Sequence, residues 1–449
     1  MRNFALFALI VVGCGAGPDA NSGPGSKSVA PSDAGGTEAD ASLGGATDAG
    51  ADGNTSQQTY PPWIRQFGGS DMDAATALAV DGSGNVYVTG YTGHRGINVG
   101  TADAFVQKYD PSGALVWAQQ FGSAKDDLPN AIRVDASGSV YVVGATYGSL
   151  TGEANGGVDA FVRKHDAAGA PVWTRQFGTG GVVSAQSVTL DARGNVYVGG
   201  TTNAALAGQT RAGQDDAYVR KYDPLGTLVW TRQFGSSDFD YCSEIGIDGS
   251  GNVYVTGIAR KALPGQTSAG GAFVHTYDVH GAFVSTLQFG TMNAGGIHVH
   301  RDVSGMLYLT GTIMGTLPGQ TSAGLLDAFL QKFDSGGTLL WGHQFGASDH
   351  DSVHAVVVDA SGSVFVAGHA SGSLPEQTGF GGGDAFVREY DASGMLKWPG
   401  LVGTDLGDTA LAIALDGSGG VYLAGTTYGA LTGQTNAGQT DAFVMHLLR

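Results

Sequence analysis

The sequence is poor in the residue types that most often carry chemistry or cross-links. Of its 449 residues only two are cysteine and 14% are charged, with 22 basic residues against 40 acidic ones. It contains no Gly-x-Ser-x-Gly, His-Glu-x-x-His or Cys-x-x-Cys motif. Cys242 is expected to be a buried apolar residue without a disulfide partner. The net charge of −18 argues against a nucleic-acid partner, because phosphates need a basic surface.

The N-terminal apolar run, Phe4–Val12, follows Arg2 and is too short to span a bilayer. It ends in Val11-Val12-Gly13-Cys14, which resembles the lipobox of bacterial lipoproteins. The resemblance implies cleavage after residue 13, lipid attachment at Cys14, and placement at the outer membrane or cell surface. An ordinary cleaved signal peptide, and therefore a secreted protein, is the alternative.

The following segment lacks the side chains that a core requires. From residue 15 to residue 59 there is no aromatic residue, and Val29 and Leu43 are the only aliphatic residues larger than Ala. We therefore predict a signal peptide at residues 1–13, a disordered Gly/Ala/Ser/Asp linker at 14–59, and a folded domain at 60–449.

Glycine is abundant, with 76 residues, and in the folded domain it is periodic. Seven copies of a unit of roughly 55 residues extend from Trp63 to the last residue. Each approximates W-x-x-Q-F-G, then D-x-S-G-N-V-Y-V-x-G, then D-A-F-V-x-K-Y-D-x-x-G. The tryptophan position is occupied by Trp63, Trp117, Trp173, Trp230, Ser285, Trp341 and Trp398.

Each unit contains four strand patterns, joined in pairs by turns that begin with Asp and end with Gly. In the first unit the strands are expected at Thr76–Val80, Asn85–Thr92, Asp103–Tyr109 and Ala114–Phe121. The Asp side chain can accept a backbone N–H two residues on, and Gly supplies the positive φ of a hairpin turn. The turn glycines are Gly84, Gly113, Gly138, Gly169, Gly194, Gly226, Gly251, Gly281, Gly305, Gly337, Gly362, Gly394 and Gly419.

Four antiparallel strands in each of seven units predict an all-β fold, a seven-bladed β-propeller. The folded domain begins with a lone fourth strand at Trp63–Phe67 and ends with a lone third strand at Asp441–Leu447. We expect the N-terminal strand to complete the last blade, which closes the ring and removes an open edge. The propeller is expected to be a monomer.

The recurring phrases D-x-x-G-N-V-Y-V-x-G and D-A-F-V-x-K-Y-D-x-x-G resemble the SBBP family of bacterial β-propeller repeats and, more distantly, NHL repeats. The resemblance extends from Trp63 to Arg449. It implies a secreted or surface-anchored propeller, and it brings no set of catalytic residues.

Acidic residues recur in pairs in the loops that lead into the first strand of a unit. Carboxylates one or two residues apart can share a Ca²⁺ ion with backbone carbonyls, so Ca²⁺ is the one cofactor considered. The alternative is that these acids cap and solvate the loops. The candidate metal ligands are Asp71, Asp73, Asp238, Asp240, Asp349 and Asp351.

A Gln-Thr phrase recurs in the loops between the second and third strands, which share a face with the acidic loops in a propeller. Gln and Thr offer donors and acceptors to a carbohydrate or peptide. The alternative is that they only satisfy loop backbone groups. The candidate ligand-binding residues are Gln209, Thr210, Gln266, Thr267, Gln320, Thr321, Gln377, Thr378, Gln434 and Thr435.

Two functions are compatible with these patterns. Near-identical loops favour a lipid-anchored envelope module that binds polysaccharide, peptide or another envelope protein without chemistry. The alternative is a propeller enzyme, a lyase or hydrolase, with its site on the loop face or in the central channel. The place for such a site is the most divergent unit, which contains His298, His300 and Ser285.

Overall fold

The computed structural model describes residues 63–93, 102–152, 156–290, 294–375, 377–416 and 419–448, with only the backbone of 294–297. The signal peptide, the linker and the lipidation site Cys14 lie outside the described residues and stay predictions. In the part that is described, no helix is long and apolar enough to cross a membrane.

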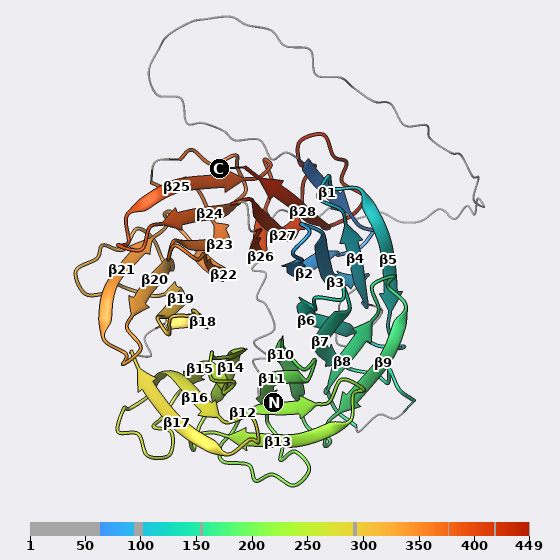
Figure 1. Cartoon of the computed structure of the whole chain (residues 1–449). Coiled ribbons are helices and arrows are strands. Elements are labelled where there is room, and N and C mark those ends of the chain that lie inside the picture. Colours follow the sequence, from blue (N-terminus) through green and yellow to red (C-terminus); the bar gives the residue numbers. More distant parts are fainter. Residues whose placement is uncertain are drawn as a thin grey trace, which may run out of the picture. The chain divides into compact units, whose positions relative to one another are not determined.

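Within these residues, 28 strands form seven antiparallel four-stranded sheets arranged in a ring (Figure 1), so the predicted seven-bladed propeller is confirmed. The first three blades, each from inner to outer strand, are β2 (Ala74–Val80), β3 (Val86–Thr92), β4 (Asp103–Tyr109) and β5 (Leu115–Phe121); β6 (Asp127–Val134), β7 (Val140–Thr146), β8 (Asp159–His165) and β9 (Pro171–Phe177); and β10 (Val183–Leu190), β11 (Val196–Thr202), β12 (Asp216–Tyr222) and β13 (Leu228–Phe234).

The fourth to sixth blades are β14 (Asp240–Ile247), β15 (Val253–Ala259), β16 (Gly271–Tyr277) and β17 (Phe283–Phe289); β18 (Ala294–Arg301), β19 (Leu307–Ile313), β20 (Asp327–Phe333) and β21 (Leu339–Phe345); and β22 (Asp351–Val358), β23 (Val364–Ala370), β24 (Asp384–Tyr390) and β25 (Leu396–Val402). The seventh blade consists of β26 (Asp408–Leu415), β27 (Val421–Thr427), β28 (Asp441–Leu447) and β1 (Trp63–Phe67).

The turns have the predicted chemistry. Oδ1 of Asp81 accepts the backbone N–H of Ser83 at 2.9 Å and of Asn85 at 3.0 Å, and the N–H of Gly84 donates to the carbonyl of Asp81. All thirteen predicted turn glycines have φ between 78° and 97°. The hairpins therefore form from local sequence alone.

The inner strand begins earlier than the sequence predicts. In the first blade it starts at Ala74 instead of Thr76, because a β-bulge between Ala75 and Ala77 lets the strand continue past the irregular position. Every inner strand has a register shift at the corresponding place. A bulge leaves the apolar pattern irregular, so a simple alternation misses these first residues.

The two ends of the folded domain meet in one sheet, as predicted. β1 pairs antiparallel with β28, with Trp63 opposite His446 and Phe67 opposite Ala442. In Figure 1 the blue strand β1 lies beside the red strands β27 and β28. The seventh blade thereby gains its fourth strand and the ring closes.

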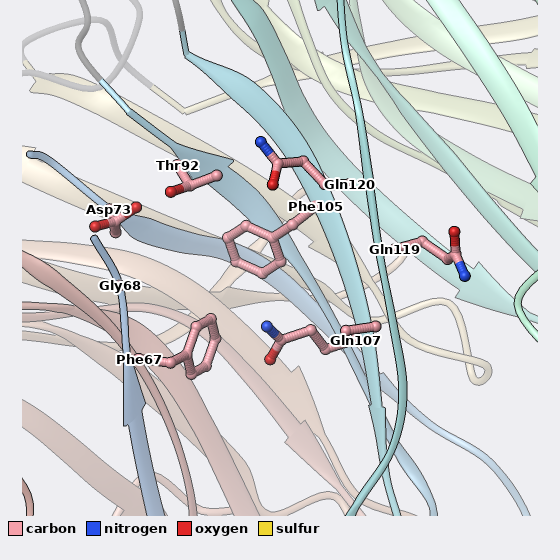
Figure 2. Close-up of a pocket in the computed structure, with 9 residues that line it drawn as sticks. Phe67, Gly68, Asp73, Thr92, Phe105, Gln107, Gln119 and Gln120 are labelled. Atoms are coloured by element: carbon pink, nitrogen blue, oxygen red, sulfur yellow. The ribbon is translucent and has the colours of Figure 1, made fainter. Parts of the chain in front are cut away.

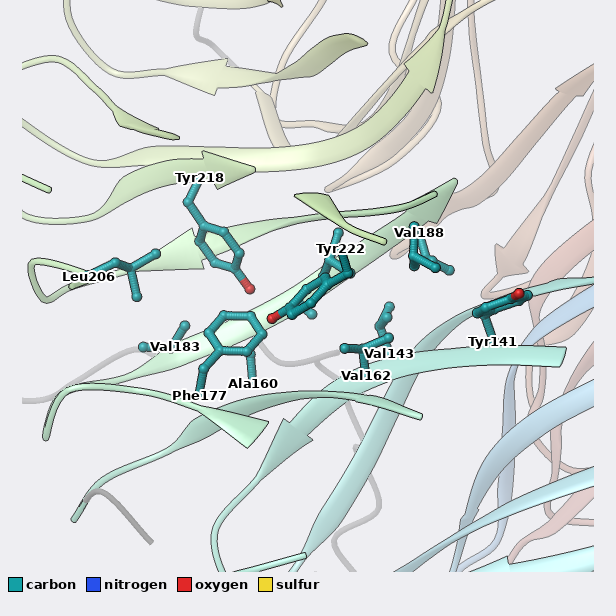
Figure 3. Close-up of a cluster of buried hydrophobic side chains, with 13 residues drawn as sticks. Tyr141, Val143, Ala160, Val162, Phe177, Val183, Val188, Leu206, Tyr218 and Tyr222 are labelled. Atoms are coloured by element: carbon teal, nitrogen blue, oxygen red, sulfur yellow. The ribbon is translucent and has the colours of Figure 1, made fainter. Parts of the chain in front are cut away.

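The hydrophobic core is divided among the seams between neighbouring blades. Each of the seven seams has its own cluster of buried side chains. Figure 3 shows the cluster between the second and third blades, where Val162 and Phe177 of one blade pack against Val188 and Tyr218 of the other. Cys242 is buried in the next cluster, as predicted.

Five of the outer strands also contact the turn of the following blade through a tryptophan. The indole N–H of Trp117 in β5 donates to the carbonyl of Ala167 between β8 and β9, at 3.1 Å. A Cβ on Gly169 in that turn would lie 2.8 Å from the Trp117 ring, so glycine is required there for space as well as for φ. The same bond, at 3.1–3.4 Å, joins four further pairs: Trp63 and Pro111, Trp173 and Pro224, Trp230 and Val279, and Trp341 and Ala392.

Deletion of residues 60–67 is expected to destabilise the domain, since it removes β1 from the closing seam. Loss of the buried Trp63 side chain alone should cost about 3–5 kcal/mol of unfolding free energy. Urea denaturation measures the change. A deletion of residues 40–47, in the predicted linker, is the control and should leave stability unchanged. Equal stability of the two variants would contradict closure by β1.

Candidate functional site

The loops between second and third strands contact the segment that leads into the inner strand of the next blade. Short parallel bridges join Val158 to Val182 and Leu326 to His350, and a further bridge joins Met72 to Thr440 at the closing seam. Both groups of candidate residues therefore lie on one face of the ring, which we call the loop face. The opposite face, formed by the Asp-Gly turns, is the turn face.

The glutamine of each Gln-Thr phrase has a structural partner. The backbone N–H of Gln209 donates to the carbonyl of Leu206 at 2.8 Å, in a turn whose Leu206 side chain is buried. Oε1 of Gln209 then accepts the backbone N–H of Gln233 in β13 at 3.1 Å. Gln320 and Gln434 accept from the outer strands of their own blades in the same way, while Gln266 donates to the carbonyl of Thr286. Gln377 repeats the backbone turn, donating to the carbonyl of Leu374.

The threonine of each phrase is exposed, whereas the glutamine beside it is half-buried. The five threonines belong to five successive blades, from the third to the seventh. Glutamine therefore fixes the loop and threonine is presented to solvent. The exposed threonines are Thr210, Thr267, Thr321, Thr378 and Thr435.

A second glutamine, in the Q-F-G phrase of the outer strand, anchors the start of the third strand. Nε2 of Gln233 donates to Oδ2 of Asp216 at 2.7 Å and to the carbonyl of Ala204 at 3.1 Å. The equivalent bond to the third-strand aspartate, at 2.6–3.0 Å, recurs in four other blades. This glutamine therefore ties the outer strand to the loop face.

The two acids of each candidate metal pair have different environments. Asp240 is fully buried and its Oδ2 accepts the backbone N–H of Ser236 at 2.6 Å, whereas Asp238 lies 3.4 Å from the ammonium of Lys261. Asp73 and Asp351 are buried in the same way, while Asp71 is half-buried and Asp349 is exposed beside His350.

Each buried aspartate instead lies close to the aspartate that starts the third strand of the preceding blade. The two carboxylates flank the glycine that ends the outer strand. A Cβ on Gly235 would lie 2.6 Å from Oδ2 of Asp240 and 2.7 Å from Oδ1 of Asp216. At the closing seam, a Cβ on Gly68 would lie 2.5 Å from Oδ2 of Asp73 and 2.7 Å from Oδ1 of Asp441. The glycine of Q-F-G is therefore required because two carboxylates approach its Cα.

Burial of these facing carboxyl groups changes their protonation. Burial, and then the charges of Asp216 and Asp238, raise the pKa of Asp240 to about 7. Burial and the charge of Asp408 raise the pKa of Asp384 to about 7. Such a carboxyl keeps its proton at a pH where an exposed one has lost it.

Among the described residues, no three His, Cys, Asp or Glu side chains are grouped so as to hold a metal ion. The candidate calcium ligands thus fall into two groups. The buried ones are Asp73, Asp240 and Asp351, and the more accessible ones are Asp71, Asp238 and Asp349. Calcium binding by these loops stays a prediction.

The alternative enzyme site was expected at His298 and His300, which both lie in the inner strand β18. Nδ1 of His300 lies 2.8 Å from Oε2 of Glu244 in the neighbouring inner strand β14. Burial lowers the pKa of His300, but the charge of Glu244 and the hydrogen bond to it outweigh burial and raise the pKa. The carboxylate therefore orients a histidine that can donate a proton.

Sequence reasoning missed Glu244, and it identified the aspartates of the third strands as a feature of the repeat without placing them beside the candidate metal ligands. A signal for Glu244 was present: at its position in β14 the other inner strands have Ala, Ser or His298. The aspartates repeat in six units, so their recurrence was visible, but a repeat pattern does not reveal which residue of the next blade each one faces.

Comparison with known families agrees with the fold. Residues 63–98, 172–206 and 229–257 match the profile described as SBBP, beta-propeller repeat. The seven-bladed structure is consistent with these matches, so these three segments are SBBP β-propeller repeats.

Curated relatives are more distant. The chain is 25% identical to the Regulatory protein FlaEY of Caulobacter vibrioides over 378 residues, 71% of this chain and 38% of that protein. It is 23% identical to the Uncharacterized WD repeat-containing protein L264 of Acanthamoeba polyphaga mimivirus, over 62% of this chain and 22% of that protein. The chain thus spans well under half the length of either relative.

Among solved structures, that of polysaccharide lyase Uly1 aligns with a TM-score of 0.47 and 12% identity. The alignment covers 83% of this chain and 89% of that one. Similarity at this level says nothing of the activity of this chain.

The facing carboxyls predict that stability falls as pH rises. The pKa of Asp240 is about 7 in the folded protein and 3.8 ordinarily, so its favourable contribution is complete below pH 3.8 and is lost as pH rises through 7. Asp240→Asn should therefore raise the melting temperature at pH 8 and reduce its decline between pH 4 and pH 8.

The matched control for this experiment is Asp391→Asn. A hydrogen bond from the Ser393 hydroxyl lowers the pKa of Asp391 to about 2, so this group does not titrate between pH 4 and pH 8. The control should keep the wild-type slope over that range. An unchanged slope in Asp240→Asn as well would refute the assignment.

Proposed function

We propose that this chain is a lipid-anchored module of the bacterial cell envelope that binds an extended partner, such as a neutral polysaccharide, across its loop face. The sequence also predicts a peptide or another envelope protein as a partner. The β-propeller of SBBP repeats supports a binding or scaffold role.

The observation that carries the proposal is the row of exposed threonines on five successive blades. Each threonine follows a glutamine whose backbone N–H holds the loop in one conformation. Five equivalent hydroxyl groups at regular intervals suit a partner that itself repeats, because each unit of the partner can meet the same group. A single asymmetric catalytic centre would not need such repetition.

The membrane location rests on the sequence before the propeller. The lipobox-like Val11–Cys14 and the residues between it and β1 fit a lipid anchor followed by a tether. Cys14→Ser is expected to move the protein from the membrane fraction to the soluble fraction after cell lysis. Retention of this variant in the membrane fraction would exclude a lipid anchor at Cys14.

The loop face is tested by replacing Thr210, Thr267, Thr321, Thr378 and Thr435 together with alanine. Binding to a panel of neutral polysaccharides is measured through the ligand-induced rise in melting temperature. A ligand that binds only the folded state stabilises it by about 2.7 kcal/mol at a hundred times its Kd. We expect that rise in the wild type and its loss in the alanine variant.

The control replaces the same five threonines with serine, which keeps each hydroxyl and loses only the methyl group. It should bind as the wild type does. Full binding by the alanine variant would move the site away from these threonines.

A further inference from the structure

One position in the third strand covers the phenylalanine of the preceding blade. In the second, third and sixth blades this position is arginine, directly after the phrase D-A-F-V or its variant. The guanidinium carbon of Arg163 lies 4.5 Å from the centre of the Phe121 ring. The corresponding distances are 4.0 Å from Arg220 to Phe177 and 4.6 Å from Arg388 to Phe345. In the fourth blade the imidazole of His275 stacks on Phe234 at 3.9 Å.

In two of these blades, the arginine is also fixed by a threonine directly opposite it on the outer strand. Nη1 of Arg163 donates to the hydroxyl of Thr174 at 3.0 Å, and Nε of Arg220 donates to that of Thr231 at the same distance. These seams therefore contain a guanidinium group between an aromatic ring and a hydroxyl group.

The closing seam lacks both groups, and so does the seam between the fourth and fifth blades, where Gln331 lies opposite Gly342. The residue at the arginine position of the first blade is Gln107, and the residue opposite it in β5 is Ala118. The amide of Gln107 is engaged by the hydroxyl of Tyr109, which donates to Oε1. The ring of Phe67 in β1 consequently has no cation from the described chain at this position.

A pocket of about 370 Å³ lies at this place (Figure 2). Phe67 and Phe105, packed edge to face with centres 5.4 Å apart, form its apolar part. Gln107, Thr92 and the buried Asp73 contribute its polar groups. The nearby cation of β1, Arg65, is directed elsewhere, since its Nε donates to the carbonyl of Gly113 at 2.7 Å.

We propose that this pocket binds the guanidinium group of a ligand outside the chain, either free arginine or an arginine side chain of a peptide. The ligand would take the place that Arg163, Arg220 and Arg388 occupy in their own seams. An aromatic ring and a carboxylate are the groups that guanidinium prefers. The net charge of −18 further favours a cationic ligand.

The pocket is independent of the threonines proposed above. The first blade has no Gln-Thr phrase, and the alanine variant of the loop face leaves Phe67 and Gln107 unchanged. Failure of one proposal therefore leaves the other standing.

The test is a titration of the full chain with L-arginine and with citrulline, followed by calorimetry. Citrulline has nearly the shape of arginine but no charge. We expect arginine to bind and citrulline to bind roughly tenfold more weakly or not at all. Equal binding of the two, or no binding of arginine, would overturn the proposal.

Gln107→Arg places the missing guanidinium in the pocket from within the chain. We expect this variant to fold, because three other blades have arginine there, and to lose arginine binding. Gln331→Arg makes the same change at the equivalent position of the fifth blade and should bind as the wild type does. Arginine binding by Gln107→Arg with wild-type affinity would refute the site.

Two further arms identify the source of the guanidinium. A blocked Gly-Arg-Gly tripeptide that binds more tightly than free arginine supports a peptide ligand, and the reverse order supports the free amino acid. Arg95 lies outside the described residues, between β3 and β4 in the sequence, and it is tested by Arg95→Ala. Arginine binding that emerges only in Arg95→Ala would overturn the proposal, because the chain would then supply the group itself.

Discussion

Every outer strand of this propeller pairs with a strand of its own blade and also packs against the next blade, and the rest of the structure depends on that constraint. Trp117 belongs to the first blade by its backbone and to the second by the bond from its indole to Ala167. Further along the outer strands, the phenylalanine of Q-F-G enters the next seam and the glycine separates carboxylates of two blades. The repeated residues therefore form the contacts between blades as well as the sheet within each blade. The pairing of β1 with β28 completes the contact between the last blade and the first.

This constraint explains which parts of the fold could be predicted from sequence. The hairpin turns are local, so Asp81 and Gly84 determine one of them without reference to the rest of the chain. The closure of the ring follows from counting strands, because Trp63–Phe67 and Asp441–Leu447 are complementary fragments of one blade. The inner-strand bulges were missed because they interrupt the alternation on which strand prediction depends.

The candidate sites could be predicted only in part. The Gln-Thr phrases were visible as repeats, but only the structure shows that Gln209 accepts a backbone N–H while Thr210 is exposed. Contacts between neighbouring blades, such as Glu244 with His300, join residues that no local pattern connects. The sequence shows that Gln107 departs from the repeat, but it does not show a pocket there. The proposed role of that pocket rests on the structural finding that Arg163 and Arg220 cover an aromatic ring in their own seams.

The seams between blades are the source of both stability and specificity. In four of them the described residues place an arginine or a histidine over the phenylalanine of the preceding blade, and we propose that the closing seam takes its cation from a ligand. A crystal structure of the full chain with arginine tests this most directly. We expect β1 paired with β28 and a guanidinium over the Phe67 ring, at the 4.0–4.6 Å separation found for Arg163, Arg220 and Arg388. A Phe67 ring covered by the chain's own side chains, with arginine absent or bound elsewhere, would contradict it.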